Sequence, residues 1–254
     1  AAWIIADAGA NLCLVDHDIL TEMTGLVLAD VQVVCLADLG QNAAIHHTPQ
    51  QAPSLTRAGD VVWLFYTSGT TGKPKGVMLT AANLMLMTLT YFSDVDDVAE
   101  EDAILYAAPM SHGGGLYNFM HVMRGARHVV PTSGGFDASE VLSLATQIRH
   151  VSMFAAPTMV RRLVDAARNS GDAGDGIKTI VYGGGPMYVA DIVEAVTIMG
   201  PRFIQIYGQG ECPMAITALS RTDIADRAHP NWRARLASVG RAQAACEIRI
   251  ARDD

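Results

Sequence analysis

The chain has 254 residues, of which 50% are hydrophobic and 17% charged, so it is too apolar to be disordered and long enough to bury a sizeable core. Its 18 basic and 26 acidic side chains give a net charge of −8 without any basic run, which disfavours a nucleic-acid partner. No apolar run approaches the ~18 residues of a membrane span, so we predict no transmembrane segment.

The first residues, AAWIIADAGANLCLV, do not fit a signal peptide, because they lack a basic start and Asp7 interrupts the apolar run. A helix that closes at Gly9, followed by a buried strand at 12–15, fits them better. Since the chain begins inside an element and without Met, we expect it to be a piece of a longer protein.

The cysteines lie far apart in the sequence, in no C-x-x-C pair and without metal-ligand spacing. They are Cys13, Cys35, Cys212 and Cys246. This pattern favours reduced, mostly buried thiols in a cytoplasmic protein.

Short apolar runs of strand length alternate with helix-length stretches through most of the chain. The strand candidates are residues 11–15, 31–36, 61–66, 103–108, 127–130, 151–155, 178–182 and 203–207. This alternation predicts an α/β architecture with mainly parallel strands that helices cover on both faces. The polar stretch 37–60 is the exception, and we expect a long surface connection there.

Two later helices have readable starts. Asp137 and Glu140 form a capping-box pattern, with Phe136 and Val141 at the flanking hydrophobic-staple positions. Pro157 suits the first turn of the next helix.

The most unusual stretch is YTSGTTGKPKGVMLT at 66–80, directly after the apolar run VVWLF, which predicts a buried strand. Glycines let backbone amides point inward around an anion, and the neighbouring hydroxyls and the two lysines add donors and charge. A Walker A loop is excluded, because Pro74 follows Lys73 where that motif has Ser or Thr and a donating amide. The stretch therefore predicts a loop that passes over phosphates without starting a helix beneath them. An ordinary surface loop would leave the lysines and the clustered hydroxyls unexplained.

YTSGTTGKPKG resembles the phosphate-loop signature of the adenylate-forming superfamily, which includes acyl-CoA synthetases and peptide-synthetase adenylation domains. Four later stretches resemble further motifs of that superfamily in the same order. They are APMSHGGGL at 108–116, YGGGPM at 182–187, IQIYGQGE at 204–211 and SVGRAQAACEIRI at 238–250. The similarity covers most of the chain from about Asp60 onward.

The resemblance implies the large N-terminal domain of a carboxylate–CoA ligase, an α/β fold with two helix-flanked, mainly parallel sheets and the start of a small barrel. We expect subdomains at roughly 1–100, 101–222 and 223–254, with the site at the carboxyl ends of strands. The family's C-terminal lid domain, with its catalytic lysine, would come later in the sequence. We therefore expect the 254-residue chain alone to be inactive.

The implied reaction adenylates a small-molecule carboxylic acid with ATP and Mg²⁺, releases pyrophosphate, and transfers the acyl group to coenzyme A. The uncharged glycines after His112 favour a fatty or aromatic acid. Two alternatives stay open: an adenylating domain that passes its acyl group to a carrier protein, and a nucleotide-binding module without turnover. Assembly into a homo-oligomer is also left open.

Residue roles follow from the motif matches. The resemblance gives catalytic roles to Lys75, His112 and Glu211, and Glu211 would also ligate Mg²⁺, which prefers oxygen ligands. A solvated acid and a structural histidine are the plainer interpretations. The residues expected around the nucleotide phosphates are Thr67, Ser68, Gly69, Thr70, Thr71, Gly72 and Lys75.

The remaining nucleotide contacts are expected in two later turns. Tyr207 would stack on adenine, although a core aromatic at a strand end is the alternative. The glycines of YGGGPM would let the purine approach closely, and they also suit a plain strand-to-helix turn. The residues expected around the adenylate are Gly183, Gly184, Gly185, Pro186, Tyr207, Gly208, Gln209 and Gly210.

Two departures from the family pattern affect the interpretation. Gly210 stands where the family usually has a threonine that donates to the α-phosphate, which removes a contact of about 1.5–3 kcal/mol unless the Gly210 amide or Gln209 replaces it. FDAS at 136–139 resembles the aspartate motif of amino-acid-adenylating domains. Its position about 25 residues after PMSHGG, and the capping pattern, make Asp137 a helix cap and disfavour an amino-acid substrate.

Overall fold

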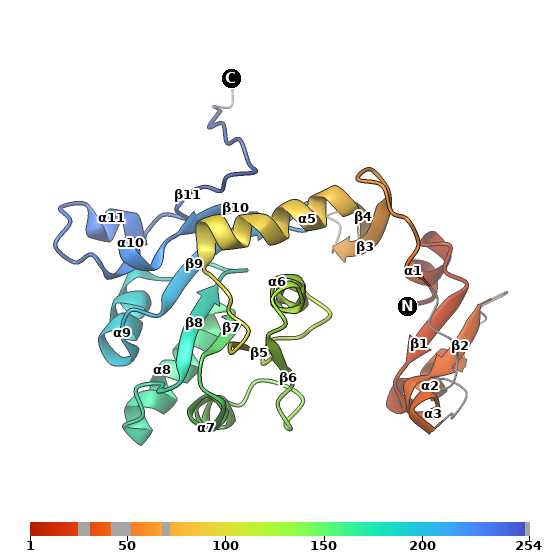
Figure 1. Ribbon diagram of the computed structural model, residues 1–254, viewed down its shortest axis with the longest axis horizontal. Coiled ribbons are helices and arrows are strands. Elements are labelled where there is room, and N and C mark those ends of the chain that lie inside the picture. Colours follow the sequence, from red (N-terminus) through yellow and green to blue (C-terminus); the bar gives the residue numbers. More distant parts are fainter. Residues whose placement is uncertain (25–30, 42–51, 68–71, 252–254) are drawn as a thin grey trace. The chain divides into compact units, whose positions relative to one another are not determined.

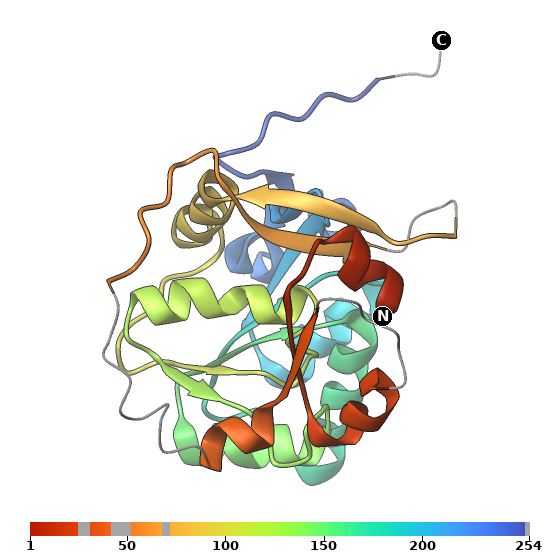
Figure 2. The ribbon, with the colours of Figure 1, turned by 90° about the vertical axis from the view of Figure 1, so that its right-hand side faces the viewer.

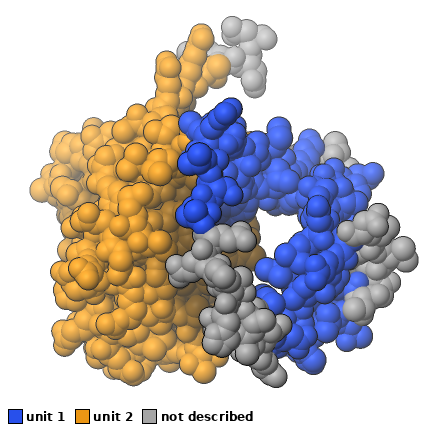
Figure 3. Space-filling view, turned by 45° about the vertical axis from the view of Figure 1, so that its right-hand side comes forward, with its two compact units in different colours: residues 1–81 blue, residues 82–254 orange. Residues whose placement is uncertain are grey.

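The computed structural model describes residues 1–24, 31–41, 52–67 and 72–251. The chain divides into two compact units, residues 1–81 and residues 82–254 (Figure 3). Each unit is described by itself below. The predicted subdomains at roughly 1–100, 101–222 and 223–254 stay a prediction.

The described part of unit 1 contains two small sheets and three short helices. Its elements are α1 Ala2–Asp7, β1 Leu12–Val15, α2 His17–Thr24, β2 Gln32–Cys35, α3 Leu36–Gln41, β3 Val61–Thr67 and β4 Lys75–Thr80. β1 and β2 are parallel, whereas β3 and β4 form the antiparallel ribbon of Figure 2. Gly9 ends the first helical segment with φ of +61°, as the sequence predicts.

Three expectations about unit 1 need correction. The strands at 12–15 and 61–66 are only partly buried, because Leu12 is 51% exposed and Val61 is 49% exposed, although Val15 is 6% exposed. Among the described residues, each belongs to a two-stranded sheet. The predicted connection at 37–60 overlaps α3, and its residues 42–51 lie outside the described part of the chain.

Unit 2 alternates strands and helices. Its elements are α5 Ala81–Thr90, which starts at the unit boundary, the π-helix η1 Tyr91–Val95, β5 Ala103–Leu105, the 3₁₀-helix η2 Gly113–Tyr117, α6 Asn118–Met123, β6 Arg127–Val129, α7 Ala138–Ile148, β7 Val151–Ala155, α8 Pro157–Ser170, β8 Ile177–Tyr182, α9 Val189–Met199, β9 Phe203–Gln209, β10 Cys212–Leu219, α10 Arg221–Ala225, α11 Trp232–Leu236 and β11 Arg241–Ala242. Among the helices that the structure describes, none combines the length and the hydrophobicity of a membrane-spanning segment.

The strands of unit 2 form one seven-stranded sheet in the order β11-β10-β9-β8-β7-β5-β6 (Figure 1). The strands from β6 to β9 run parallel to their neighbours, whereas β10 is antiparallel to both β9 and β11. The predicted α/β class with helix-flanked sheets is confirmed. The sequence did not predict β4 or β10, and the stretch 238–250 contributes only the two residues of β11.

Successive side chains of a strand point to opposite faces of the sheet, so the parallel strands have apolar side chains on both faces. Helices cover both of these faces. Ala103 and Leu105 belong to the larger hydrophobic cluster, which α7, α8 and α9 complete on one face. Ile104 and Tyr106 belong to a second cluster, with Tyr117 and Met120 of η2 and α6 on the opposite face.

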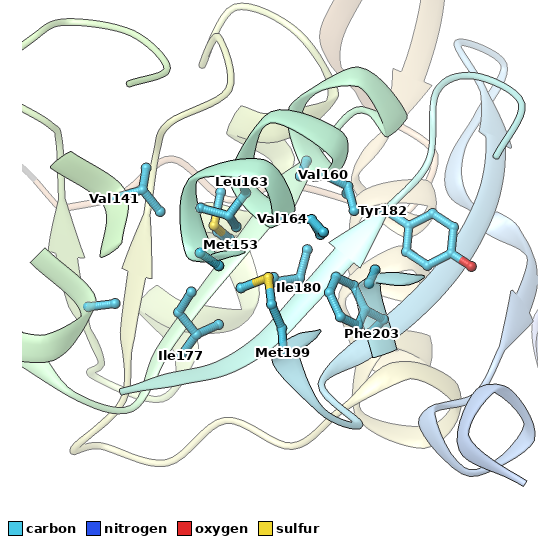
Figure 4. Packing of buried hydrophobic residues seen from close by; sticks show 14 of the residues in the cluster. Val141, Met153, Val160, Leu163, Val164, Ile177, Ile180, Tyr182, Met199 and Phe203 are labelled. Atoms are coloured by element: carbon cyan, nitrogen blue, oxygen red, sulfur yellow. The ribbon is translucent and has the colours of Figure 1, made fainter. Parts of the chain in front are cut away.

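The larger cluster forms the main core. Figure 4 shows Met153 and Ile180, from neighbouring strands, packed among Leu163 of α8 and Met199 of α9. All four side chains are at most 1% exposed. Such burial is worth roughly 1.5–3 kcal/mol for each large apolar side chain, so this face fixes the position of the strands.

The predicted capping box at α7 is half correct. The Asp137 carboxylate accepts a hydrogen bond from the Glu140 amide at 2.8 Å, as expected of an N-cap. The Glu140 carboxylate does not return to the Asp137 amide, since it accepts from the amide of Thr132 at 2.7 Å instead. The cap therefore also holds the loop before the helix. Pro157 occupies the first turn of α8, as predicted.

Replacing Asp137 with Ala should lower the free energy of unfolding by about 1 kcal/mol, because the Glu140 amide loses its acceptor at the helix start. Asp137→Asn is the matched control, since asparagine caps nearly as well without the charge. Urea denaturation of both variants measures the difference. Equal losses in the two variants would show that charge, and not capping, is what Asp137 contributes.

Candidate functional site

The order of the sheet reverses at the boundary between β5 and β7. The chain leaves β5 for β6 through α6 on one face, then returns past β5 to β7 and continues to β8 and β9 through helices on the other face. Open α/β sheets bind ligands beyond the carboxyl ends of their strands at such a switch point. The residues that follow β5, β7, β8 and β9 are therefore the first place to look for a site.

A tight glycine turn follows β5 and carries His112. The His112 amide donates to the carbonyl of Pro109 at 3.2 Å, and its carbonyl accepts from the Gly115 amide at 2.9 Å. A Cβ on Gly115 would lie 1.9 Å from the carbonyl oxygen of Met110, so only glycine fits there. The turn leaves the His112 side chain exposed at the carboxyl end of β5.

A second glycine turn follows β8. A Cβ on Gly183 would lie 2.6 Å from the carbonyl oxygen of Ile206 on β9, and Gly184 has a φ of +76°. The expectation of a strand-to-helix turn made of glycines is confirmed, whereas the approach of a purine stays a prediction. Gly184, Gly185 and Pro186 are exposed.

An aromatic contact joins these two turns across β7. The Tyr117 ring of η2 stacks on the Phe154 ring of β7 with centroids 5.5 Å apart. The Phe154 ring also lies 3.8 Å from the position of a Cβ on Gly184. The segments after β5 and β8 therefore share one packed edge of the sheet.

The third segment is the hairpin between β9 and β10. Gln209 pairs with Cys212, so Gly210 and Glu211 are the two residues of the turn. The Glu211 side chain is exposed. The described residues contain no group of three His, Cys, Asp or Glu side chains that could hold a metal ion. A single exposed carboxylate still fits Mg²⁺, which is commonly held by one or two carboxylates together with substrate phosphates.

Tyr207 lies near the end of β9, two residues before Gln209, which flanks this turn. Its side chain is 36% exposed, which does not fit the alternative of a core aromatic. Its hydroxyl accepts a hydrogen bond from the Gln209 side-chain amide at 2.7 Å. This bond occupies one N–H of the Gln209 side-chain amide. Gln209 therefore has one donor fewer with which to replace the threonine hydroxyl that is missing at Gly210.

A register shift in β10 fixes the shape of the hairpin. After the pair Gln209–Cys212, the next pair is Tyr207–Thr217, so β10 carries extra residues. One of them, Met214, has a φ of +60°. A Cβ on Gly208 would lie only 2.2 Å from the Met214 amide nitrogen, so the glycine allows the two backbones to touch.

Unit 1 carries the predicted phosphate loop between β3 and β4. Thr67 is the last residue of β3 and pairs with Lys75, the exposed first residue of β4. Gly72 has a φ of +83°, which favours glycine. Ser68, Gly69, Thr70 and Thr71 lie outside the described residues. The loop leads into a strand, so the prediction that no helix starts beneath it is confirmed.

The base of this loop is anchored to the start of the chain. The Tyr66 hydroxyl donates to the Asp7 carboxylate at 2.7 Å, and its ring meets Trp3 edge-on with centroids 6.3 Å apart. Across the ribbon, Gly76 leaves room for the Tyr66 ring, whose Cζ would lie 3.0 Å from an added Cβ. The sequence pattern did not predict this role for Tyr66.

The structure therefore gathers His112, the Gly183–Pro186 turn and the Tyr207–Glu211 segment at one edge of the unit 2 sheet. The loop residues Thr67, Gly72 and Lys75 belong to unit 1 and are placed within that unit alone.

Buried polar atoms behind the His112 turn were not predicted. The Tyr117 hydroxyl and the His121 Nε2 atom are buried and have no hydrogen-bond partner among the described residues. The other ring nitrogen, Nδ1, lies 2.7 Å from the carbonyl oxygen of Tyr117. Burial lowers the pKa of His121 to about 4, so the ring is neutral at pH 7. A lone histidine in an apolar helix gives no sequence signal for such a position.

An open groove lies apart from this edge, on the outer surface between α7 and α8. Its lining includes Asp137, Arg162 and Asp165. None of the predicted site residues lines it.

A family model and similar proteins point to the same family. The family model described as AMP-binding enzyme matches residues 1–254. The chain is 28% identical to the medium/long-chain-fatty-acid–CoA ligase FadD8 of Mycobacterium tuberculosis, over 94% of this chain and 43% of that protein. It is 32% identical to a 2-succinylbenzoate–CoA ligase of Bacillus subtilis, over 75% of this chain and 36% of that protein. The chain thus spans less than half the length of these relatives.

Solved structures share the fold. The N-terminal domain of FACL13 from Mycobacterium tuberculosis matches with a TM-score of 0.79 and 20% identity, over 96% of this chain and 59% of that one. The o-succinylbenzoate CoA synthetase MenE from Bacillus subtilis, in complex with ATP and magnesium, matches with a TM-score of 0.78 and 25% identity, over 99% of this chain and 49% of that one.

Gly208→Ala should disturb the hairpin, because the added methyl group meets the backbone of Met214, which cannot rotate away as a side chain can. We expect a loss of about 1–3 kcal/mol in the free energy of unfolding, as for overpacking. Gly113→Ala is the matched control, since nothing lies within 4 Å of its Cβ position. Denaturant unfolding compares the variants, and an equal loss in both would contradict the close contact at Gly208.

Proposed function

Because the chain belongs to the AMP-binding enzyme family, we propose that the intact protein is an ATP-dependent carboxylate–CoA ligase. The observation that carries the proposal is the gathering of His112, the Gly183–Pro186 turn and the Tyr207–Glu211 segment at one edge of one sheet. The relatives named above are CoA ligases, which supports the same reaction class.

The proposed reaction has two steps. A carboxylate oxygen of the acid attacks the α-phosphorus of ATP, an acyl-adenylate forms, and pyrophosphate leaves. The thiol of coenzyme A then attacks the acyl carbonyl carbon, a thioester forms, and AMP leaves. Both steps need charge neutralisation on phosphates and fixed orientation of the reacting groups.

The unit 2 residues have separate tasks in this proposal. Tyr207 offers a partly exposed ring on which adenine stacks, and the exposed backbone at Gly184 and Gly185 lets the purine approach. His112, exposed at the carboxyl end of β5, orients the acid's carboxylate. Glu211 is the carboxylate that would hold Mg²⁺, which supplies charge neutralisation on the phosphates when bound.

The unit 1 loop supplies the phosphate contacts. Thr67 and Gly72 border the loop, and the exposed Lys75 ammonium at the start of β4 balances phosphate charge. The remaining proposed contacts, Ser68, Gly69, Thr70 and Thr71, rest on the motif match alone.

We propose a fatty or aromatic acid as the substrate. The turn after β5 consists of uncharged glycines, and buried apolar side chains at Leu116 and Met120 follow it. Among relatives, FadD8 is named for medium- and long-chain fatty acids and another protein is a feruloyl-CoA synthase. Asp137 is occupied as a helix cap, so FDAS offers no partner for a substrate ammonium.

The test uses the intact protein with ATP, magnesium and a panel of fatty, aromatic and amino acids. ATP–pyrophosphate exchange detects adenylation, and thioester formation with coenzyme A detects the second step. Exchange without thioester would favour transfer to a carrier protein, and nucleotide binding without exchange would favour a module without turnover. Activity with amino acids alone would overturn the proposed substrate class.

Glu211→Gln should lower the rate of adenylation by on the order of 10²–10³, because the near-isosteric amide lacks the charge that favours the metal. Glu194→Gln is the matched control, since Glu194 pairs with Arg168 on the helix surface, away from the proposed site. Pyrophosphate exchange across a magnesium titration measures both variants. An unchanged magnesium dependence in the Glu211 variant sinks its assignment as a ligand.

Gly210→Thr should maintain or improve the affinity for ATP, because it restores a hydroxyl donor beside Glu211. Gly210→Ala is the control, since it adds a side chain without a donor. Nucleotide affinity is measured by isothermal titration on folded protein. A large loss with Thr as well as with Ala would mean that the turn needs glycine and that the α-phosphate contact lies elsewhere.

A further inference from the structure

Two cysteines that lie 34 residues apart in the sequence meet beside the β9–β10 turn. The Sγ atoms of Cys212 and Cys246 are 3.6 Å apart, and both residues are free and partly buried. Cys212 directly follows Glu211 and is the first residue of β10. Neither cysteine belongs to a short motif, so this pair could not be predicted from the sequence.

Several hydrogen bonds hold the second cysteine in place. β11 pairs with β10 through Ala242 and Thr217, and directly after it the side chain of Gln243, which is 2% exposed, donates to the Met214 carbonyl at 2.7 Å. The Ala244 amide donates to Asp94 at 2.9 Å. The Cys246 amide then donates to the Gln243 carbonyl at 2.9 Å. Hydrogen bonds of the backbone and of Gln243 therefore hold the two cysteines next to each other.

We propose that Cys212 and Cys246 form a redox-sensitive pair that closes to a disulfide in the presence of a peroxide and alters the turn that carries Glu211. Hydrogen peroxide is the oxidant. One thiol sulfur attacks the peroxide, the O–O bond breaks, a sulfenic acid forms and water leaves. The other sulfur then displaces the hydroxyl group as a second water, and the S–S bond forms. Two electrons pass from the sulfurs to the peroxide.

Closing the disulfide moves the backbone next to Glu211. The sulfurs must approach by roughly 1.5 Å to reach the S–S bond length of about 2.05 Å. Cys212 pairs with Gln209 across the turn, so its displacement shifts Gly210 and Glu211. This consequence rests on the proposed function, in which Glu211 holds the metal. A misplacement of about 1 Å can cost on the order of 10²-fold in rate, so we expect at least a tenfold loss of activity.

The pairing is tested by peptide mapping of the intact protein. After treatment with hydrogen peroxide and digestion with trypsin, peptide 203–221, which holds Cys212, should be linked to peptide 242–249, which holds Cys246. Dithiothreitol should separate them. Cys13 and Cys35, on neighbouring strands of unit 1, are the internal control and should stay unlinked. Absence of the 203–221 to 242–249 link overturns the proposal.

The effect on the turn is tested by two further measurements. Hydrogen exchange of the β9–β10 turn should slow on oxidation, and acyl-CoA formation should fall at least tenfold and recover with dithiothreitol. Cys246→Ser should keep full activity and lose both responses, whereas Cys13→Ser should keep them. A linked protein with unchanged exchange overturns the proposed effect on the turn. Ligase activity absent even in reduced protein would refute the proposed function, while mapping and exchange would still decide the redox pair.

Discussion

Contact between glycine and a neighbouring backbone is the constraint on which the candidate site depends. At the end of β8, Gly183 lies against the carbonyl of Ile206, and on β9 Gly208 lies against the Met214 amide. A methyl group at either position would come within 2.6 Å of the partner atom. Such contacts leave no space for adjustment, because buried packing is nearly as dense as a crystal. The glycines therefore set how closely β8, β9 and β10 approach at the edge where the candidate residues lie.

The opposite end of β8 is held by charge instead of by close packing. The Lys178 ammonium lies 2.6 Å from Asp102, whose side chain is 4% exposed, and Arg221 donates to Asp96 at 2.8 Å. Burial alone would lower the pKa of Lys178, but the hydrogen bond and charge of Asp102 outweigh it and raise the pKa. Removing one partner would leave a buried charge unpaired, which is far more costly than the pair is favourable. These contacts fix the segment before β5 and the start of α10.

The sequence predicts most of the unit 2 fold and less of the rest, for physical reasons. Strands such as β7 and β8 are buried on both faces and consist mostly of apolar residues, so composition identifies them. β10 begins with Cys212 and Pro213 and contains a register shift, which breaks the two-residue alternation that marks a strand. In unit 1, apolar runs at β1 and β3 predict burial, yet exposure depends on what packs against a sheet, and no local pattern encodes that. Candidate site residues could be proposed from the sequence where a motif is contiguous, and their roles stay a prediction. The Tyr117–Phe154 stacking and the contact of Cys212 with Cys246 arise only from the folded chain.

Glu211 lies on a two-residue turn, which limits how firmly the fold holds its carboxylate. A side chain on a strand inherits its position from the ladder, but a turn residue is held only by its flanking pair, here Gln209 and Cys212. A further restraint acts on β10 near its register shift. The Gln243 side chain, which follows β11, donates to the carbonyls of Met214 and Thr217 on β10. The restraint on the carboxylate is therefore assembled from β9, β10 and the segment after β11 together. Functional groups need support of this kind to hold a productive geometry within about 0.5 Å. Gln243 therefore helps to restrain the hairpin that carries the proposed metal ligand.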